Sequence, residues 1–233
     1  MNSMSSTRAP LPLTLSGLGF PALNVPSVSL ELLPGASTAL ILPEEELAAL
    51  EALLCGLPAE VRGTAGIRGL DPGGEGVWNG PLAGRVARTF SPLFGGGCWL
   101  ENLDVDENML LAALMRGERH ATARARALAL ARRFGLDLLP EGRRGNTPSG
   151  TLTVCQWVRA FLMEEAELFL MIDCLRKAPP EAMKALGQAS RERRQRGAAF
   201  FWLLPALDPA QADALGVDTI LDPVNLTPAA PHS

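Results

Sequence analysis

Apolar runs that alternate with amphipathic segments predict an α/β fold. The run Thr38–Leu42 is typical of a buried central strand, and it is followed at once by Glu44–Leu54, where leucines recur at helical spacing. The same order returns later, where a helix expected from about Leu152 to Glu165 leads into a second apolar run, Leu168–Ile172. Strands that alternate with helices pair in parallel, so the pattern predicts a mostly parallel sheet flanked by helices.

Further elements extend this pattern along the chain. The other expected strands cover 12–16, 27–33, part of 63–80, 85–90, 198–204 and 217–221, and the other expected helices cover 107–116, 121–134, 180–197 and 208–215. The block 91–150 holds two helices and no clear strand, which predicts a helical subdomain beside the sheet. Residues 1–10 are predicted to be a flexible N-terminus, 11–222 one domain, and 223–233 an extended tail.

Composition narrows the classes of function. The 25 acidic and 21 basic residues give a net charge of −4, which argues against a nucleic-acid partner, and 47% apolar residues can fill a core. The uncharged stretch 9–30 is interrupted by several prolines and glycines, so a spanning helix is not expected. The sequence predicts a soluble protein whose association with a membrane depends on a partner.

Cysteine and histidine are too few and too scattered for a metal centre. The chain has four cysteines and two histidines, which are Cys55, Cys98, Cys155, Cys174, His120 and His232. No two cysteines have the spacing of a zinc site, so no metal is expected. An enzyme that uses Cys155 or Cys174 as a nucleophile would have only His120 as a base, which makes this hypothesis the weakest of those considered.

Four local segments, in order, resemble the ATPase domain of ABC transporters over about 11–221. They are Leu53–Leu57 after the phosphate loop, Leu93–Gly95 before the loop glutamine, Glu101–Asn108 at the entry to the helical subdomain, and Pro148–Gly150 at the signature loop. The resemblance implies a mostly parallel sheet flanked by helices, an N-terminal antiparallel β part, and a helical subdomain over about 91–150.

The resemblance also implies partners and a location. Such ATPase domains pair with an identical chain or a second ABC ATPase and work on a membrane permease, so the chain is expected to be cytoplasmic and peripheral on the inner face of the cell membrane. The stretch Leu93–Leu111 looks most like the ATPases of lipid-moving MCE-type importers, which implies lipid transport.

The segment that matches the phosphate loop lacks the residues its chemistry needs. The family's loop supplies glycines, a lysine and a hydroxyl to phosphate and Mg²⁺. The corresponding positions here are Pro43, Glu44, Glu45, Glu46, Leu47 and Ala48. Three carboxylates at a helix start satisfy the helix dipole within the chain, and each would repel a phosphate by about 1 kcal/mol in water at 4 Å.

The other motifs of the family are also incomplete. Gly95 takes the place of the loop glutamine, and Asp173 corresponds to either the metal-binding Asp or the catalytic Glu, depending on the alignment. Ser149 and Gly150 are a remnant of the signature motif; Ser149 is either a helix N-cap or a contact to a nucleotide held by a partner chain. Contact with the permease is expected at Gly95, Gly96, Gly97 and Trp99, with Trp99 either an exposed anchor or buried.

These departures predict a catalytically degenerate subunit with a structural or regulatory role beside a permease. On this interpretation the chain is not an enzyme, ATP hydrolysis is not expected from it alone, and no cofactor is expected. The alternative hypothesis is a soluble adaptor or scaffold that keeps the ABC fold without a permease.

Overall fold

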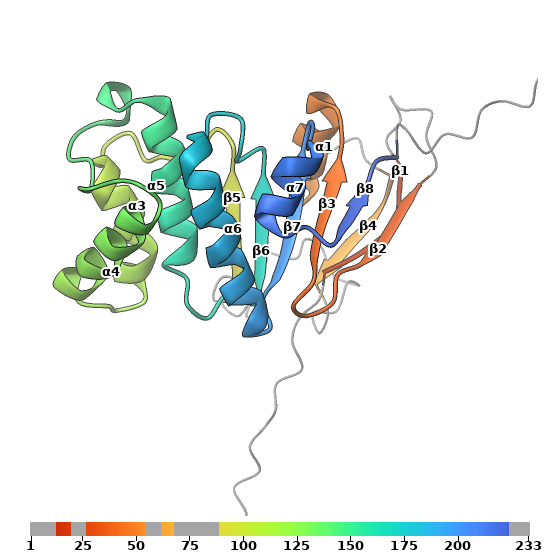
Figure 1. Cartoon of the computed structure of the whole chain (residues 1–233), viewed down its shortest axis with the longest axis horizontal. Helices are drawn as coiled ribbons and strands as arrows, with labels where there is room; N and C mark the ends of the chain where they lie inside the picture. The colour runs from red at the N-terminus through yellow and green to blue at the C-terminus, as the bar shows by residue number, and fades with distance from the viewer. Residues whose placement is uncertain (1–12, 20–26, 55–61, 68–88, 224–233) are drawn as a thin grey trace, which may run out of the picture.

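A parallel sheet of five strands forms the centre of the protein (Figure 1). The structure is a computed structural model, and it describes residues 13–19, 27–54, 62–67 and 89–223. The strands lie in the order β5-β6-β7-β3-β8, and all neighbouring pairs are parallel. Their bounds are Phe90–Phe94 for β5, Leu168–Ile172 for β6, Ala199–Leu204 for β7, Ser37–Ile41 for β3 and Thr219–Leu221 for β8.

The N-terminal part forms a smaller antiparallel sheet. Its central strand is β1 (Leu13–Gly19), which pairs with β2 (Val28–Glu31) on one side and with β4 (Arg62–Ile67) on the other. Leu13 and Leu15 of β1 are buried against the larger sheet. The predicted antiparallel part is therefore confirmed.

Helices cover both faces of the parallel sheet. They are α1 (Glu44–Leu54), α3 (Val105–Met115), α4 (His120–Arg133), α5 (Ser149–Phe161), α6 (Pro180–Gln195) and α7 (Pro209–Leu215), with a 3₁₀ turn η1 (Arg144–Asn146) before α5. In Figure 1, α3 and α4 lie beyond the β5 end of the sheet, and the antiparallel strands lie near the β8 end.

Alternating side chains of the strands divide the interior into two cores. Phe200 and Trp202 of β7 belong to the core shared with α5 and α6, whereas Phe201 and Leu203 belong to the core shared with α1 and β1. Burying a Leu or Phe side chain fully stabilises the fold by about 1.5–3 kcal/mol. A strand that is buried on both faces therefore has apolar residues at successive positions, and its sequence forms an apolar run. This is why β3, β6 and β7 were recognisable from the sequence.

The predicted α/β class is confirmed, but several boundaries differ. The block expected to be helical opens with β5, where Pro92 breaks the strand pattern in the sequence; a proline is tolerated there because β5 lies at the edge of the described sheet. The strand expected over 85–90 thus begins at Phe90. Residues 85–88, the predicted N-terminus 1–10, the tail 224–233 and the end of the segment matched at 53–57 lie outside the described residues.

Candidate functional site

The carboxyl ends of three strands bring most of the predicted site residues to one edge of the sheet. β3 leads through Pro43 into α1, β6 leads into Asp173, and β5 leads into Gly95. Phe94 pairs with Ile172, so the residues that follow them, Gly95 and Asp173, lie side by side. In open α/β sheets this edge is where ligands bind.

The residues at the start of α1 differ in their exposure to solvent. Pro43, Glu44 and Glu45 are exposed, while Glu46 is only 6% exposed and Leu47 is packed into the core. The Leu47 N–H bonds to the carbonyl of Pro43 at 3.0 Å, so the helix begins with a regular turn. The resemblance places the family's lysine at Leu47, and the burial of this side chain suits an apolar residue.

An arginine that the sequence analysis missed joins α1 to the end of β6. Arg176 Nη2 lies 2.7 Å from Glu44 Oε1 and 3.1 Å from Asp173 Oδ2. The side chains of Glu44 and Arg176 are 68% and 45% exposed, so solvent screens this pair and its contribution to stability is small. Part of this contact could have been predicted from the sequence, because Arg176 follows Asp173 by only three positions.

Two carboxyl groups near this bridge have raised pKa values. The pKa of Asp173 is raised chiefly by partial burial, with Arg176 opposing the shift and the charge of Glu44 adding to it. The pKa of Glu51 on α1 is raised by burial and then by the negative charge of Asp173. Both pKa shifts are therefore mainly effects of burial, and at Asp173 the charge of Arg176 lowers the pKa by more than the charge of Glu44 raises it.

Gly95 has a packing reason to lack a side chain. A Cβ at this position would lie 2.6 Å from the carbonyl oxygen of Asp173 and 2.9 Å from its Cβ. Asp173 has a φ of 44°, a left-handed conformation that is uncommon for residues other than glycine. A glutamine, which the family resemblance places at Gly95, would require the backbone to shift.

The start of α5 has a different character. Pro148 is the N-cap and makes no side-chain capping bond, and Ser149 is the first helical residue, so the interpretation of Ser149 as the N-cap is wrong. Ser149 is exposed, and the first turn has no acidic residue. A Cβ at Gly150 would lie 3.2 Å from the carbonyl oxygen of Lys177, which places α5 against the loop after β6. The free N–H groups of this turn suit an anion.

A buried tryptophan ties α5 to the same loop. The Trp157 indole N–H donates to the carbonyl oxygen of Cys174 at 3.2 Å. Cys174 directly follows Asp173, so the end of β6 and the body of α5 are held together by a buried hydrogen bond. Removing such a donor leaves a buried carbonyl unpaired, which costs about 1–3 kcal/mol.

The glycine segment expected to contact a permease is mostly an internal support. A Cβ at Gly97 would lie 2.0 Å from Trp99 Nε1, and Gly97 has a φ of +69°, whereas a Cβ at Gly96 would meet nothing within 4 Å. Trp99 is only 8% exposed, with the guanidinium carbon of Arg159 5.4 Å from its ring centroid. The possibility that Trp99 is an exposed anchor is therefore excluded.

An apolar groove lies next to this segment, between β5, α3 and α5. Its volume is about 370 Å³, and its lining includes Phe94, Cys98, Leu100, Asn108, Met115 and Arg159. Met115 is 81% exposed and Leu100 is 49% exposed, which is unusual for large apolar side chains. The sequence analysis missed the groove because its residues come from a strand, a loop and two helices that only the fold brings together.

The cysteines do not form a nucleophilic centre. Cys155 and Cys174 are buried, and burial raises the pKa of Cys155 to about 12 and the pKa of Cys174 further still. Both thiols are therefore protonated and unreactive near neutral pH. Within the described ranges no group of three or more His, Cys, Asp or Glu side chains is placed to hold a metal ion.

Within the part of the chain that the structure describes, no helix has the length and apolar character needed to cross a bilayer.

Solved structures, rather than sequence relatives, are similar to this chain. No protein-family model and no curated protein matches the sequence. A structure described as the ATP-binding subunit of an ABC transporter matches with a TM-score of 0.70 and 26% identity, over 91% of this chain and 87% of that chain. The ADP conformation of an ATP-binding cassette of an ABC transporter matches with a TM-score of 0.62 over 92% of this chain and 88% of that chain; at 15% identity it shows the fold alone. These similarities support the ABC transporter ATPase family for this chain.

Two predictions are corrected by these comparisons. The expectations that the chain is not an enzyme and takes no cofactor are wrong, because the structural neighbours are ATP-binding subunits and one was solved in its ADP conformation. These predictions were wrong because they applied the acidic character of the start of α1 to the whole site. Three carboxylates at α1 describe how that helix is stabilised, and they do not exclude nucleotide contacts elsewhere in the fold.

The two helix starts differ in how well they fit a nucleotide. The start of α1 carries Glu44, Glu45 and Glu46 and no lysine, so it does not fit a triphosphate in the arrangement described. The start of α5 fits better, because Ser149 is exposed and no carboxylate stands in its first turn.

Proposed function

We propose that this chain is an ATP-binding subunit of an ABC transporter that works on a membrane permease as one of two paired ATP-binding chains. The observation that carries this proposal is the similarity of 91% of the chain to an ATP-binding subunit of an ABC transporter. The parallel sheet, with α1, Asp173 and α5 at its carboxyl edge, gives the proposal a plausible site.

In the proposed pair, the nucleotide lies between two chains, and this chain contributes the start of α5. Ser149 would offer its hydroxyl and Gly150 its backbone N–H to the phosphates held by the other chain. The open first turn of α5 and its lack of acidic residues support this role. This contribution requires a partner that is a different ATP-binding chain, because the start of α1 does not fit a triphosphate and an identical chain would not hold the phosphates there.

The proposed permease contact is the apolar groove. Gly95, Gly97 and Trp99 would support it from inside, Gly96 is exposed at its edge, and Met115 would meet the partner directly. The groove suits a short amphipathic segment on the cytoplasmic side of a permease, which would place this chain peripherally on the inner face of the membrane. Lipid transport rests on the stretch 93–111 alone and stays a prediction.

Site-specific photo-crosslinking in intact cells tests the proposal. A benzophenone side chain at Met115 is expected to crosslink to a multi-spanning membrane protein, and the purified complex is expected to hydrolyse ATP. The matched control is Leu138, which is 73% exposed but does not line the groove. Crosslinking of Met115 only to proteins without membrane spans would contradict the proposal and favour the soluble adaptor.

A further inference from the structure

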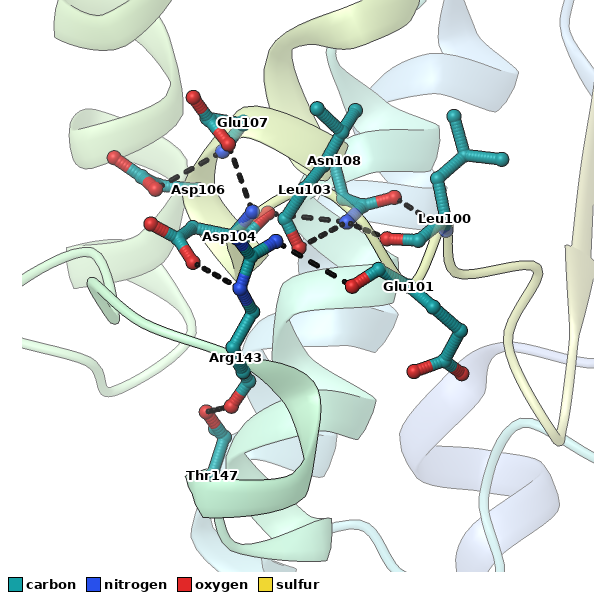
Figure 2. A network of polar contacts seen from close by, with 9 residues as sticks. All are labelled: Leu100, Glu101, Leu103, Asp104, Asp106, Glu107, Asn108, Arg143 and Thr147. Carbon is teal, nitrogen blue, oxygen red and sulfur yellow. Dashed lines mark hydrogen bonds and ion pairs between the residues drawn. The ribbon is translucent and has the colours of Figure 1, made fainter.

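A network of polar contacts begins in the wall of the groove (Figure 2). Asn108 is only 4% exposed, and its side-chain oxygen accepts the N–H of Leu100 at 2.8 Å. Its amide nitrogen donates to the carbonyl oxygens of Leu100, Leu103 and Asp104 at 3.1, 3.3 and 3.0 Å. Asn108 and Leu100 both line the groove, so one buried amide fixes the turn 100–104 to the groove wall.

The network continues from this turn to the segment before α5. Arg143 Nε lies 3.3 Å from Asp104 Oδ1, and Arg143 Nη1 donates to the carbonyl oxygen of Glu101 at 3.4 Å. The backbone N–H of Val105 donates to the carbonyl oxygen of Gly142 at 2.9 Å. Figure 2 shows Arg143 lying between the turn 100–104 and Thr147.

The last part of the network reaches the first turn of α5. The carbonyl oxygen of Arg143 accepts the N–H of Asn146 at 3.0 Å and, over a longer distance of 3.4 Å, the hydroxyl of Thr147. The carbonyl oxygen of Pro148 then accepts the N–H of Leu152 at 2.9 Å, which is the first hydrogen bond of the helix. Every step from the groove to Ser149 is thus a hydrogen bond, an ion pair or a short stretch of chain.

We propose that Arg143 is a positioning residue that makes the order of the first turn of α5 depend on what fills the groove. The inference rests on the proposed function, in which the groove receives a permease segment and α5 faces nucleotide. An occupant presses on Leu100, Asn108 transfers the displacement to the turn 100–104, and Arg143 carries it to the segment before α5. A guanidinium suits this task because its rigid fork can bond a carboxylate and a carbonyl at once.

Stability alone does not account for the arrangement of Arg143. Its side chain is 55% exposed and that of Asp104 is 41% exposed, so the ion pair contributes less than about 1 kcal/mol to folding. What the side chain determines is the geometry of the link between two loops. A second route is open, because Arg159 and Ala160 near the end of α5 also line the groove. The test separates these two routes.

The test fills the groove of the full chain covalently and measures amide hydrogen exchange at the start of α5. In a Cys55→Ser background, N-phenylmaleimide modifies the exposed Cys98, which lines the groove, while the buried Cys155 and Cys174 stay unmodified. We expect modification to slow exchange of the Leu152 amide by about threefold or more, since a filled groove restrains the first turn. In Arg143→Ala we expect the same modification to leave the rate unchanged.

A neighbouring arginine provides the matched control. The side chain of Arg144 lies 3.3 Å from the carboxylate of Glu101, and that carboxylate is 79% exposed. Arg144→Ala removes the same charge and is expected to respond to modification like the unsubstituted chain. Arg143→Lys keeps the charge but lacks the forked guanidinium, so we expect less than half of the slowing of Leu152 exchange that the unsubstituted chain shows. This variant gives a second test if Arg143→Ala folds poorly.

Two results would overturn the inference. One is an unchanged Leu152 exchange rate after modification of the unsubstituted chain, which would mean that the groove does not influence α5. The other is an equal slowing in Arg143→Ala, which would assign the link to a route without Arg143, either α5 itself through Arg159 or the backbone hydrogen bond from Val105 to Gly142. Because the test uses neither nucleotide nor permease, its failure is distinguishable from failure of the proposed function.

Discussion

The starts of α1 and α5 contact neighbouring residues of one loop, yet they present opposite environments to an anion. Arg176 reaches Glu44 at the start of α1, while the carbonyl of Lys177 lies against Gly150 at the start of α5. Both helices carry the same partial positive charge at their N-termini. In α1 the carboxylates of the first turn compensate this partial charge, whereas the first turn of α5 has no acidic residue to compensate it.

This difference teaches that the ligand-binding character of a site cannot be taken from one helix. The acidic start of α1 was the strongest signal in the sequence, and it led to the prediction that no nucleotide is bound. The similarity to ATP-binding subunits corrects that prediction. The start of α5, which is less conspicuous in the sequence, is where this chain is best suited to meet a phosphate.

Among the substitutions that test this comparison, Gly95→Ala beside the end of β6 is expected to have the largest effect. Gly95→Ala places a Cβ within 2.6 Å of the Asp173 carbonyl oxygen, and we expect the free energy of unfolding to fall by about 1–3 kcal/mol. Gly96→Ala is the matched control, since nothing lies within 4 Å of its Cβ, and its effect should stay within about 0.5 kcal/mol. Urea unfolding measures both. Equal effects would mean that the end of β6 is not held by Gly95.

At α5, the expected effect is on function and not on folding. Ser149→Ala removes an exposed hydroxyl that makes no capping bond, so the free energy of unfolding should change by less than about 0.5 kcal/mol. We expect ATP hydrolysis by the purified permease complex to fall about tenfold, which corresponds to about 1.4 kcal/mol. Glu181→Ala at the start of α6 is the control. Unchanged hydrolysis in Ser149→Ala would remove the functional difference between the two helix starts.

Breaking the bridge between α1 and β6 should have a smaller effect. Both side chains are substantially exposed, so we expect Arg176→Met or Glu44→Gln to lower the free energy of unfolding only slightly. A double-mutant cycle measures the coupling, which should weaken as salt is raised to about 1 M. A coupling that is independent of salt would show that the bridge is far less exposed to solvent than described.

The smallest effect concerns the raised pKa of Glu51. A carboxyl group with a raised pKa stabilises the fold in its protonated form, and this contribution is lost as the pH rises through its folded-state pKa. Glu51→Gln mimics the protonated form, so it should be more stable than the unsubstituted chain at pH 7, by less than about 1 kcal/mol. Thermal unfolding at pH 7 and near pH 4 measures this. A difference that grows on acidification would contradict the assigned shift.

The sequence predicted the elements that are buried on both faces and missed those whose role depends on neighbours. β6 is fully buried and was located with its bounds intact. β5 was displaced because Pro92 reads as a strand breaker, although the sheet edge accommodates it. The start of α5 was predicted too late, at about Leu152, because the apolar pattern of the helix begins there. The helix in fact begins at Ser149, with an exposed first residue.

Within the candidate site, single residues were located but their contacts were not. Asp173 was expected at a strand end and lies there. Its contact with Gly95 and the burial of Trp99 depend on packing between segments far apart in the sequence. Spacing along one chain segment carries no information about such contacts, so the groove and the Arg143 network could only come from the fold.

Thiol protection at the start of α5 tests the central claim most directly. In the membrane-bound complex of a Cys55→Ser, Cys98→Ser chain, Ser149→Cys is labelled with a maleimide with and without Mg-ATP, and Lys184→Cys on the exposed face of α6 is the control. The account predicts that Mg-ATP slows labelling at position 149 by about tenfold or more and leaves position 184 unaffected. Equal labelling rates at position 149 with and without Mg-ATP would contradict it.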